Sequence, residues 1–342
     1  MNTHSDVVLS VQNLSVSFST PDGLVKAVTD LSFDLHRGET LSIVGESGSG
    51  KSVTASSIMR LNNSGTATTT GRILLNGVDI LSAGESDVRS MRGRDVAMVF
   101  QDPMSALNPY YTVGAQIDEA YLVHHPKASK TEARAVTLSM LRRVGIPNPD
   151  ARVDEYPHQF SGGMRQRIVI AIALINNPVV LIADEPTTAL DVTVQAQILD
   201  LMMELQAEFN MAIILITHDL GVVAEVAQDV IVMYGGRVVE RSTVEGLFAE
   251  PVHPYAAGLL NAVTSLEGTA RGALQTIPGA PPSMIAIPSG CSFHPRCSFN
   301  EGAGTACTTE VPVLRSVGQH GSLTACHLPN DQLIALRSKK SA

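Results

Sequence analysis

Hydrophobic and polar residues alternate near the start of the chain, which is the pattern of strands with one buried face. Leu14, Val16 and Phe18 alternate with polar residues, and Pro-Asp-Gly at 21–23 predicts a turn. Residues 72–80 hold two short apolar stretches around Asn-Gly, the dipeptide most typical of a tight hairpin. The pattern therefore predicts a set of antiparallel strands in this part of the chain.

Further along, the alternation gives way to short runs that are almost entirely apolar. Residues 41–44, 179–183 and 211–216 have this character, which is typical of parallel strands buried on both faces. Helical spacing separates these runs, for example the interval of four between Val136 and Met140. Buried strands that alternate with helices predict an α/β fold.

Two changes of composition indicate how the chain is organised. Residues 102–160 are polar with helical spacing, and an apolar helix follows, so we expect a helical subdomain over about 102–175. Pro and Gly become frequent after about residue 250. We therefore expect a main domain over 1–250 and a small, loop-rich extension over 251–342.

Composition narrows the classes of protein that fit. Hydrophobic residues make up 44% of the 342 residues, enough for a large core and too many for a disordered chain. The net charge of −9 disfavours a non-specific nucleic-acid binder, and we expect no nucleic-acid partner. The longest clean apolar run, residues 168–175, is too short to span a membrane, and residues 1–10 lack the pattern of a secretion signal. We expect the protein to be cytoplasmic.

Residues 45–52 match the phosphate-binding loop at every fixed position, and they follow an apolar run and precede a helical pattern. Glycines let successive backbone N–H groups turn toward one anion, and the helix N-terminus adds partial positive charge. We expect Lys51 to reach the β- and γ-phosphates of a nucleotide and the Ser52 hydroxyl to bind Mg²⁺. A flexible Gly/Ser linker would not explain the strand before the loop or its Lys-Ser ending. The expected nucleotide-binding residues of the loop are Gly45, Glu46, Ser47, Gly48, Ser49, Gly50, Lys51 and Ser52.

Two adjacent carboxylates end the apolar run at 179–183. Ligands bind beyond the carboxyl ends of parallel strands, so Asp184 is placed to hold Mg²⁺ directly or through water. Glu185 is placed to polarise the water that attacks the γ-phosphate. The structural alternative is a strand that runs into an acidic helix cap, with Pro186 in the first turn of the helix.

A Ser-Gly-Gly sequence precedes the apolar helix at 168–175. Ser161 is a good N-cap residue, and Gly162 and Gly163 leave backbone N–H groups open to a second anion. An ordinary capped helix is the alternative for this segment taken alone.

Together these elements resemble the ATP-binding cassette (ABC) ATPases. The resemblance implies a P-loop NTPase fold, with a RecA-like core, an antiparallel β subdomain and a helical subdomain. It implies that residues 161–163 of one subunit close on the γ-phosphate held by the phosphate loop of another subunit. ATP and Mg²⁺ would then join two ATPase subunits.

The same resemblance assigns roles to four further positions. Gln101 matches the Q-loop glutamine, which senses Mg²⁺ and couples to a membrane partner. Residues 189–191, ending in Asp191, match the D-loop, and His218 matches the switch histidine that contacts the γ-phosphate. Phe18 matches a residue that stacks on adenine. The structural alternatives are an ordinary hydrogen-bonded histidine and a strand core residue.

One position departs from the family pattern. Met164 follows Ser-Gly-Gly where the family usually has glutamine. The γ-phosphate contacts come from the serine and the glycine N–H groups, so we expect the site to work without that glutamine side chain.

Longer motifs resemble the peptide/nickel importer ATPases, and most closely the dipeptide/oligopeptide type with C-terminal cysteines. The resemblance implies import of peptides from the cytoplasmic side of the inner membrane. It implies a homologous second ATPase subunit, two integral-membrane permease subunits and an extracytoplasmic peptide-binding protein. Nickel, haem and glutathione importers use similar ATPases, so the solute stays open. The motifs lie at residues 100–103, 107–109, 112–114, 156–159, 187–193 and 253–255.

All four cysteines lie after residue 290, with spacings that fit neither a zinc ribbon nor a compact ferredoxin motif. They match the dipeptide-type subunits, where four thiolates hold a [4Fe–4S] cluster, so the resemblance implies that cluster here. Zinc bound by cysteine plus one of His294, His320 or His327 is an alternative, and so are free cysteines. The four residues are Cys291, Cys297, Cys307 and Cys326.

Soluble ABC ATPases are the competing class. Those of DNA repair or chromosome structure carry a long coiled-coil or zinc insertion before the Ser-Gly-Gly element, and residues 102–160 contain no heptads. Translation-factor ABC proteins carry two cassettes, and this chain has one phosphate loop.

Overall fold

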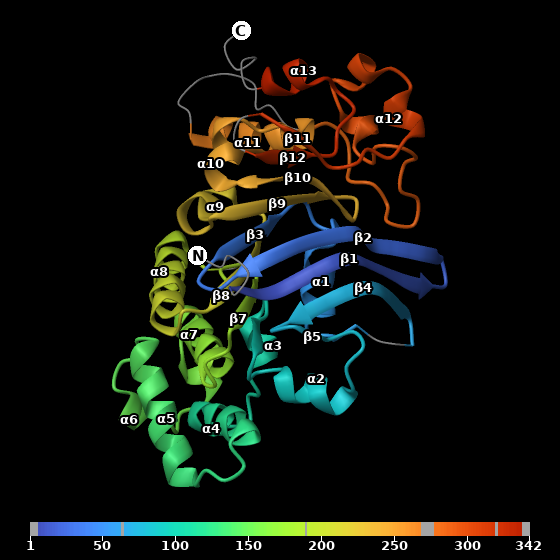
Figure 1. Ribbon diagram of the computed structural model, residues 1–342. Helices are drawn as coiled ribbons and strands as arrows, with labels where there is room; N and C mark the ends of the chain where they lie inside the picture. The colour runs from blue at the N-terminus through green and yellow to red at the C-terminus, as the bar shows by residue number, and fades with distance from the viewer. Residues whose placement is uncertain (1–5, 63–64, 189, 268–276, 319–320, 337–342) are drawn as a thin grey trace. The chain divides into compact units, whose positions relative to one another are not determined.

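The computed structural model describes residues 6–62, 65–188, 190–267, 277–318 and 321–336, and its elements are drawn in Figure 1. The chain divides into two compact units. The first comprises residues 1–9, 34–39 and 74–215, and the second comprises residues 10–33, 40–73 and 216–342. Within the described ranges, no helix has both the length and the apolar character needed to cross a membrane.

Buried strands form the centre of the first unit. They lie in the order β8 (Ala212–Thr217), β7 (Val180–Asp184), β6 (Val96–Val99), and β6 and β7 are parallel, with Val96 opposite Val180. Every residue of β7 and β8 is buried. The apolar runs at 179–183 and 211–216 are therefore confirmed as strands covered on both faces.

The helices of the first unit gather mainly between β6 and β7 in the sequence, where the composition predicts a helical insertion (Figure 1). Met140 is buried on α5, and all but one of the residues from 168 to 174 are buried on α7. The helices and remaining strand of this unit are β5 (Val78–Asp79), α2 (Glu85–Met91), α3 (Pro103–Ala106), α4 (Val113–His124), α5 (Lys130–Arg143), α6 (Pro149–Arg152), the 3-10 helix Pro157–Gln159, α7 (Gly162–Leu174) and α8 (Val192–Phe209).

Two groups of strands form the second unit. β3 (Thr40–Val44) is buried throughout and parallel to β9 (Asp229–Tyr234), which pairs antiparallel with β10 (Arg237–Thr243). β2 (Gly23–His36), β1 (Val7–Thr20) and β4 (Ala67–Leu75) lie in that order in a separate sheet. The alternation at the N-terminus thus correctly predicts strands, with the turn at 21–23 between β1 and β2. The Asn-Gly hairpin is confirmed by the antiparallel pair Leu75–Val78.

The C-terminal part of the chain adds strands to the sheet of β9 and β10. β12 (Ser322–Thr324) pairs antiparallel with β10, placing Thr324 opposite Glu240, and β11 (Arg315–Val317) pairs with β12. The remaining helices of this unit are α1 (Lys51–Ile58), α9 (Leu220–Val226), α10 (Val244–Ala249), α11 (Pro254–Glu267), the 3-10 helices His294–Arg296 and Asn300–Ala303, α12 (Ala306–Thr309) and α13 (Asn330–Ile334).

An aromatic cluster joins this C-terminal part to β9. Tyr255 of α11 and Phe293 pack against Tyr234 of β9, with ring centroids 4.7 and 5.1 Å from the Tyr234 ring. Each of the three side chains is at most 3% exposed. Aromatic pairs at this spacing stabilise a contact beyond what the burial of apolar area contributes. The cluster therefore holds α11 and the Phe293 segment on the sheet that carries the phosphate loop.

Candidate functional site

The phosphate loop lies between β3 and α1, and two of its glycines have no room for a side chain. Gly45 and Gly50 have φ angles of 153° and 104°. A Cβ on Gly45 would lie 2.3 Å from the carbonyl oxygen of Met233, and one on Gly50 would lie 2.4 Å from that of Ala27. Close approach of the backbone, as well as conformational freedom, therefore requires glycine at both positions.

Lys51 is turned back onto the loop. Its Nζ donates to the carbonyl oxygens of Gly45 at 2.7 Å and Glu46 at 3.1 Å, and the residue is only 6% exposed. The Ser49 hydroxyl is buried without a hydrogen-bond partner among the described residues. The loop thus concentrates a cation and a buried polar group at the start of α1, which suits an anionic ligand.

Glu46 is held by two residues from far along the chain, and only one of them lies in a sequence motif. Arg296 donates to both carboxylate oxygens, at 2.7 and 3.1 Å, and the backbone N–H of Glu46 donates to the Tyr255 hydroxyl at 2.9 Å. Tyr255 belongs to the motif His-Pro-Tyr at 253–255, whereas no sequence pattern indicated Arg296.

In the first unit, the structure brings Gln101 and Glu185 together. The Gln101 amide donates to Glu185 Oε2 at 2.9 Å, and the Thr188 hydroxyl donates to the same oxygen at 3.0 Å. Asp184 is buried at the end of β7, and Glu185 has a φ of 48°, which is uncommon for a residue with a side chain. The chain turns after Glu185, so the alternative of a helix with Pro186 in its first turn is wrong.

The Ser-Gly-Gly element begins α7 as its sequence predicts. The Ser161 hydroxyl accepts from the backbone N–H of Met164 at 3.4 Å, which is the N-cap contact. Gly163 has a second reason to be glycine, because a Cβ there would lie 2.6 Å from Val194 Cγ1 of α8. Gly162 is exposed at the same helix start.

The other residues that the family resemblance singles out lie at the ends of strands and helices or on a strand. Asp191 is the N-cap of α8 and accepts from the Val194 N–H at 2.9 Å, while Ala189 lies outside the described residues. His218 directly follows β8 and is exposed. Phe18 is half-buried on β1. The phosphate loop, Phe18 and His218 belong to the second unit, and the other site residues named above belong to the first.

The four cysteines have their sulfurs free of disulfides. Burial raises the pKa of every one of these thiols, to about 11 for Cys297 and about 12 for Cys326, and neighbouring cysteines add to the rise for all but Cys307. Among the described residues, however, no three His, Cys, Asp or Glu side chains are grouped to hold a metal ion. The expected four-thiolate cage is therefore not preformed.

The histidines of the zinc alternative have other contacts. His294 Nδ1 lies 2.8 Å from the carbonyl oxygen of Cys291, and His327 Nε2 lies 2.8 Å from that of Glu310. A nitrogen that bonds a carbonyl oxygen carries the proton and is not itself a metal ligand, so only the other ring nitrogen of each histidine is open to a metal. His320 lies outside the described residues.

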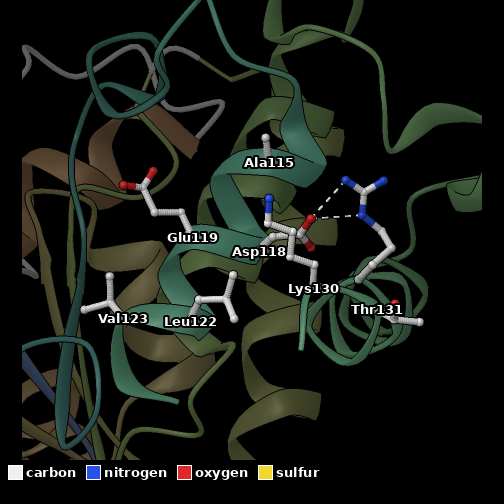
Figure 2. A pocket seen from close by; sticks show the side chains of 8 residues that line it. Ala115, Asp118, Glu119, Leu122, Val123, Lys130 and Thr131 are labelled. Atoms are coloured by element: carbon white, nitrogen blue, oxygen red, sulfur yellow. Dashed lines mark hydrogen bonds and ion pairs between the residues drawn. The ribbon is translucent and has the colours of Figure 1, made fainter. Parts of the chain in front are cut away.

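A cavity of about 840 Å³ lies between α4 and α5, separate in sequence from every predicted site residue (Figure 2). Leu122 and Val123 give it an apolar wall, and Val123 is 67% exposed. Asp118 at its edge pairs with Arg134 at 2.9 Å, so these two charges satisfy each other.

Two segments of the sequence match known protein families. Residues 28–188 match the family described as ABC transporter, and residues 239–303 match the family described as Oligopeptide/dipeptide transporter, C-terminal region. The Bacillus subtilis dipeptide transport ATP-binding protein DppD is 56% identical over 292 residues, 85% of this chain and 86% of that protein. The Salmonella typhimurium oligopeptide transport ATP-binding protein OppD is 49% identical over 334 residues, 96% of each chain.

A solved structure agrees with these sequence relatives. The dimeric ATP-binding cassette MJ0796 bound to ADP and Pi aligns with a TM-score of 0.62 at 26% identity, covering 69% of this chain and 98% of that one. The α/β cassette fold expected from the sequence is thereby confirmed. The chain belongs to the ABC transporter family, as an ATP-hydrolysing transport subunit of the group that carries the oligopeptide/dipeptide transporter C-terminal region.

Proposed function

We propose that this chain powers the import of dipeptides or oligopeptides across the cytoplasmic membrane, as a peripheral subunit on the cytoplasmic face. The observation that carries the proposal is the similarity to dipeptide and oligopeptide transport ATP-binding proteins over 85–96% of the chain, C-terminal region included. Importers of this kind pair the ATPase with other chains. The proposed partners are a homologous ATPase subunit, two integral-membrane permease subunits and an extracytoplasmic peptide-binding protein.

The domain boundary near residue 250 is part of this proposal. Residues 1–250 would form the ATPase domain, with the helical subdomain at about 102–175, and 251–342 the C-terminal extension. The family match over 239–303 supports a distinct C-terminal region beginning close to that boundary.

MgATP is the proposed nucleotide ligand. The backbone N–H groups of residues 45–52 would cradle its phosphates, and Lys51 would exchange its bonds to the loop carbonyls for the β- and γ-phosphates. Mg²⁺ would be held by Ser52, Asp184 and Gln101, whose side chains carry the oxygen ligands that it prefers. Phe18 would stack on the adenine.

Hydrolysis would use Glu185 as the base. Water attacks the γ-phosphorus, the bond to the β–γ bridging oxygen breaks, and the water proton passes to the Glu185 carboxylate. The bond from the Gln101 amide to Glu185 supports this role, because a glutamine can donate through nitrogen to the base while its oxygen stays available to the cation.

Closure of two subunits would complete the site. Residues 161–163 present a helix N-terminus that would meet the γ-phosphate of the partner subunit, and His218 and Asp191 would contact the nucleotide from their own loops. Reopening after phosphate release would return the membrane subunits to their starting state.

The test replaces Glu185 with glutamine in the complex reconstituted with its membrane subunits in vesicles. We expect Glu185→Gln to bind MgATP normally and to lose at least about 100-fold in ATP turnover, the usual contribution of a general base. Glu245→Gln, an exposed position of α10, is the matched control and should keep turnover. Rapid turnover in Glu185→Gln would refute the assignment of the base.

The same vesicles decide the cargo. Uptake of labelled dipeptides and oligopeptides that stops without ATP supports the proposal, whereas transport restricted to nickel, haem or glutathione replaces the substrate class. Co-purification with ribosomes or DNA instead of membrane subunits would replace the transporter role altogether.

A [4Fe–4S] cluster bound by Cys291, Cys297, Cys307 and Cys326 completes the proposal. Four free thiols, each at least partly buried, form a donor set of the right chemistry, and neighbouring cysteines raise the pKa of three of them. A bound cluster would cross-link the four segments that carry the cysteines and so add order to this part of the chain. Anaerobically purified protein should contain iron and sulfide near four per chain, and colourless protein with stoichiometric zinc would refute the cluster.

A further inference from the structure

The phosphate loop is contacted by residues that lie 209 and 250 positions later in the chain. Every polar group of Glu46 has a partner: the side chain pairs with Arg296, the N–H donates to Tyr255, and the carbonyl accepts from Lys51 and from the Ser49 N–H. Two of these partners come from the C-terminal part of the chain, and none of the function derived above needs them.

Arg296 is itself held rigidly. Its Nε donates to the Pro278 carbonyl at 2.8 Å and its Nη1 to the Tyr234 hydroxyl at 3.3 Å, and only 8% of the residue is exposed. With these contacts in place, the guanidinium is pre-oriented for the two carboxylate oxygens of Glu46. Two-pronged bonds of this kind restrict the position of both partners more than a single ion pair does.

Other residues of the C-terminal segment also lie beside the phosphate loop. A hollow of only about 10 Å³ separates loop residues 46–49 from Pro281, Pro282 and Met284. The carbonyl of Ser49 also accepts from the N–H of Gly236, which anchors the second half of the loop to the turn after β9. The C-terminal segment and β9 therefore enclose the side of the loop occupied by Glu46.

We propose that Arg296 is a positioning residue of the phosphate loop, which fixes Glu46 and thereby the backbone N–H groups that bind the triphosphate. The inference rests on the proposed nucleotide function and adds a residue from outside the cassette to it. Released from Arg296, Glu46 would place an unpaired carboxylate beside the phosphate site, and the loop would lose its fixed conformation. The C-terminal region would thus set nucleotide affinity in its own chain.

The experiment measures MgATP binding by titration calorimetry on the purified full-length chain. Arg296→Gln should weaken binding by about tenfold, as expected when one partner of a partly buried ion pair is removed. Arg296→Lys, which keeps the charge without the two-pronged geometry, should fall between Arg296→Gln and wild type. In hydrogen exchange of the nucleotide-free protein, the amides of residues 45–52 should exchange faster in Arg296→Gln.

Arg315→Gln is the matched control. Arg315 lies in the same C-terminal region and donates to the carbonyl oxygen of Cys326, but it does not contact the phosphate loop. It should lower the thermal midpoint while leaving MgATP affinity within about twofold of wild type, because distant sites act independently. An Arg296→Gln protein with a lower midpoint but unchanged affinity and loop exchange would overturn the proposal.

A second variant tests the same pair from its other side, in case Arg296→Gln disturbs folding. Glu46→Gln takes away the charge on the other side of the pair, and it too should weaken MgATP binding. The double variant should bind no more weakly than the worse single variant, since both act through one interaction. Wild-type affinity in Glu46→Gln, or losses that multiply in the double variant, would refute the inference. A wild-type chain that binds no MgATP would instead refute the proposed function.

Discussion

The buried carboxyl group of Glu240 should make the free energy of unfolding depend on pH. It lies on β10 with no exposed surface, and burial raises its pKa from 4.5 to about 8. One carboxylate oxygen accepts from the N–H groups of Val252 and His253, at 3.1 and 2.7 Å, and the other has no hydrogen-bond partner in the part of the chain that the structure describes. The two N–H bonds favour ionisation, but they do not offset the loss of solvent.

The direction of this pH effect follows from the pKa of Glu240 in the folded and in the unfolded protein. The folded pKa lies above the unfolded one, so the folded protein keeps a proton that the unfolded chain has already released. Stability is therefore fully present below pH 4.5 and is lost as the pH rises toward 8. Each pH unit in that window removes about 1.4 kcal/mol.

His253 contributes with the opposite sign and defines the useful window. Burial lowers its pKa from 6.5 to about 3, so its contribution grows with pH and is complete above about pH 6.5. Between pH 6.5 and pH 8 the contribution of His253 is therefore constant, while that of Glu240 still changes. It should lower the free energy of unfolding by about 2 kcal/mol across that interval.

The assay compares urea unfolding of wild type and Glu240→Gln at several pH values from 6.5 to 8. The glutamine oxygen can still accept both N–H bonds, so the variant removes the ionisation and keeps these contacts. We expect the variant to be less stable overall, because its amide NH₂ is buried, but to lack the 2 kcal/mol loss. The exposed Glu245→Gln should retain it. An identical pH slope in Glu240→Gln and wild type would refute the reasoning.

Two further substitutions test the local structure of the site. Gly45→Ala should abolish detectable MgATP binding in calorimetry, because its Cβ would lie 2.3 Å from the Met233 carbonyl oxygen, and normal binding would contradict the need for glycine there. Ser161→Ala removes the N-cap of α7 and should lower the free energy of unfolding by about 1 kcal/mol in denaturant titrations, whereas Ser161→Asp should restore it.

Much of the fold could be predicted because its signals are short-range. The apolar runs, the Asn-Gly turn and the Gly-rich loop each specify a backbone conformation within a few residues, and each appears where the pattern places it. Strands β11 and β12 escaped prediction because three residues are too few for a periodicity. The pairing of β12 with β10 depends on a partner about 80 residues away, and β11 in turn pairs with β12.

Part of the candidate site could likewise be predicted from the sequence, and part depended on tertiary structure. Residue types and spacing alone predicted the phosphate loop, Asp184 and Glu185, since the chemistry of phosphate transfer restricts which side chains can serve, and the family resemblance added Gln101. Only the tertiary structure decided that Gln101 donates to Glu185 across 84 positions and that Arg296 holds Glu46 across 250. The four cysteines show the same limit, because spacing counts possible ligands, whereas the direction of each side chain decides whether they meet. Contacts between distant positions depend on how elements pack, and no local pattern in the chain encodes them.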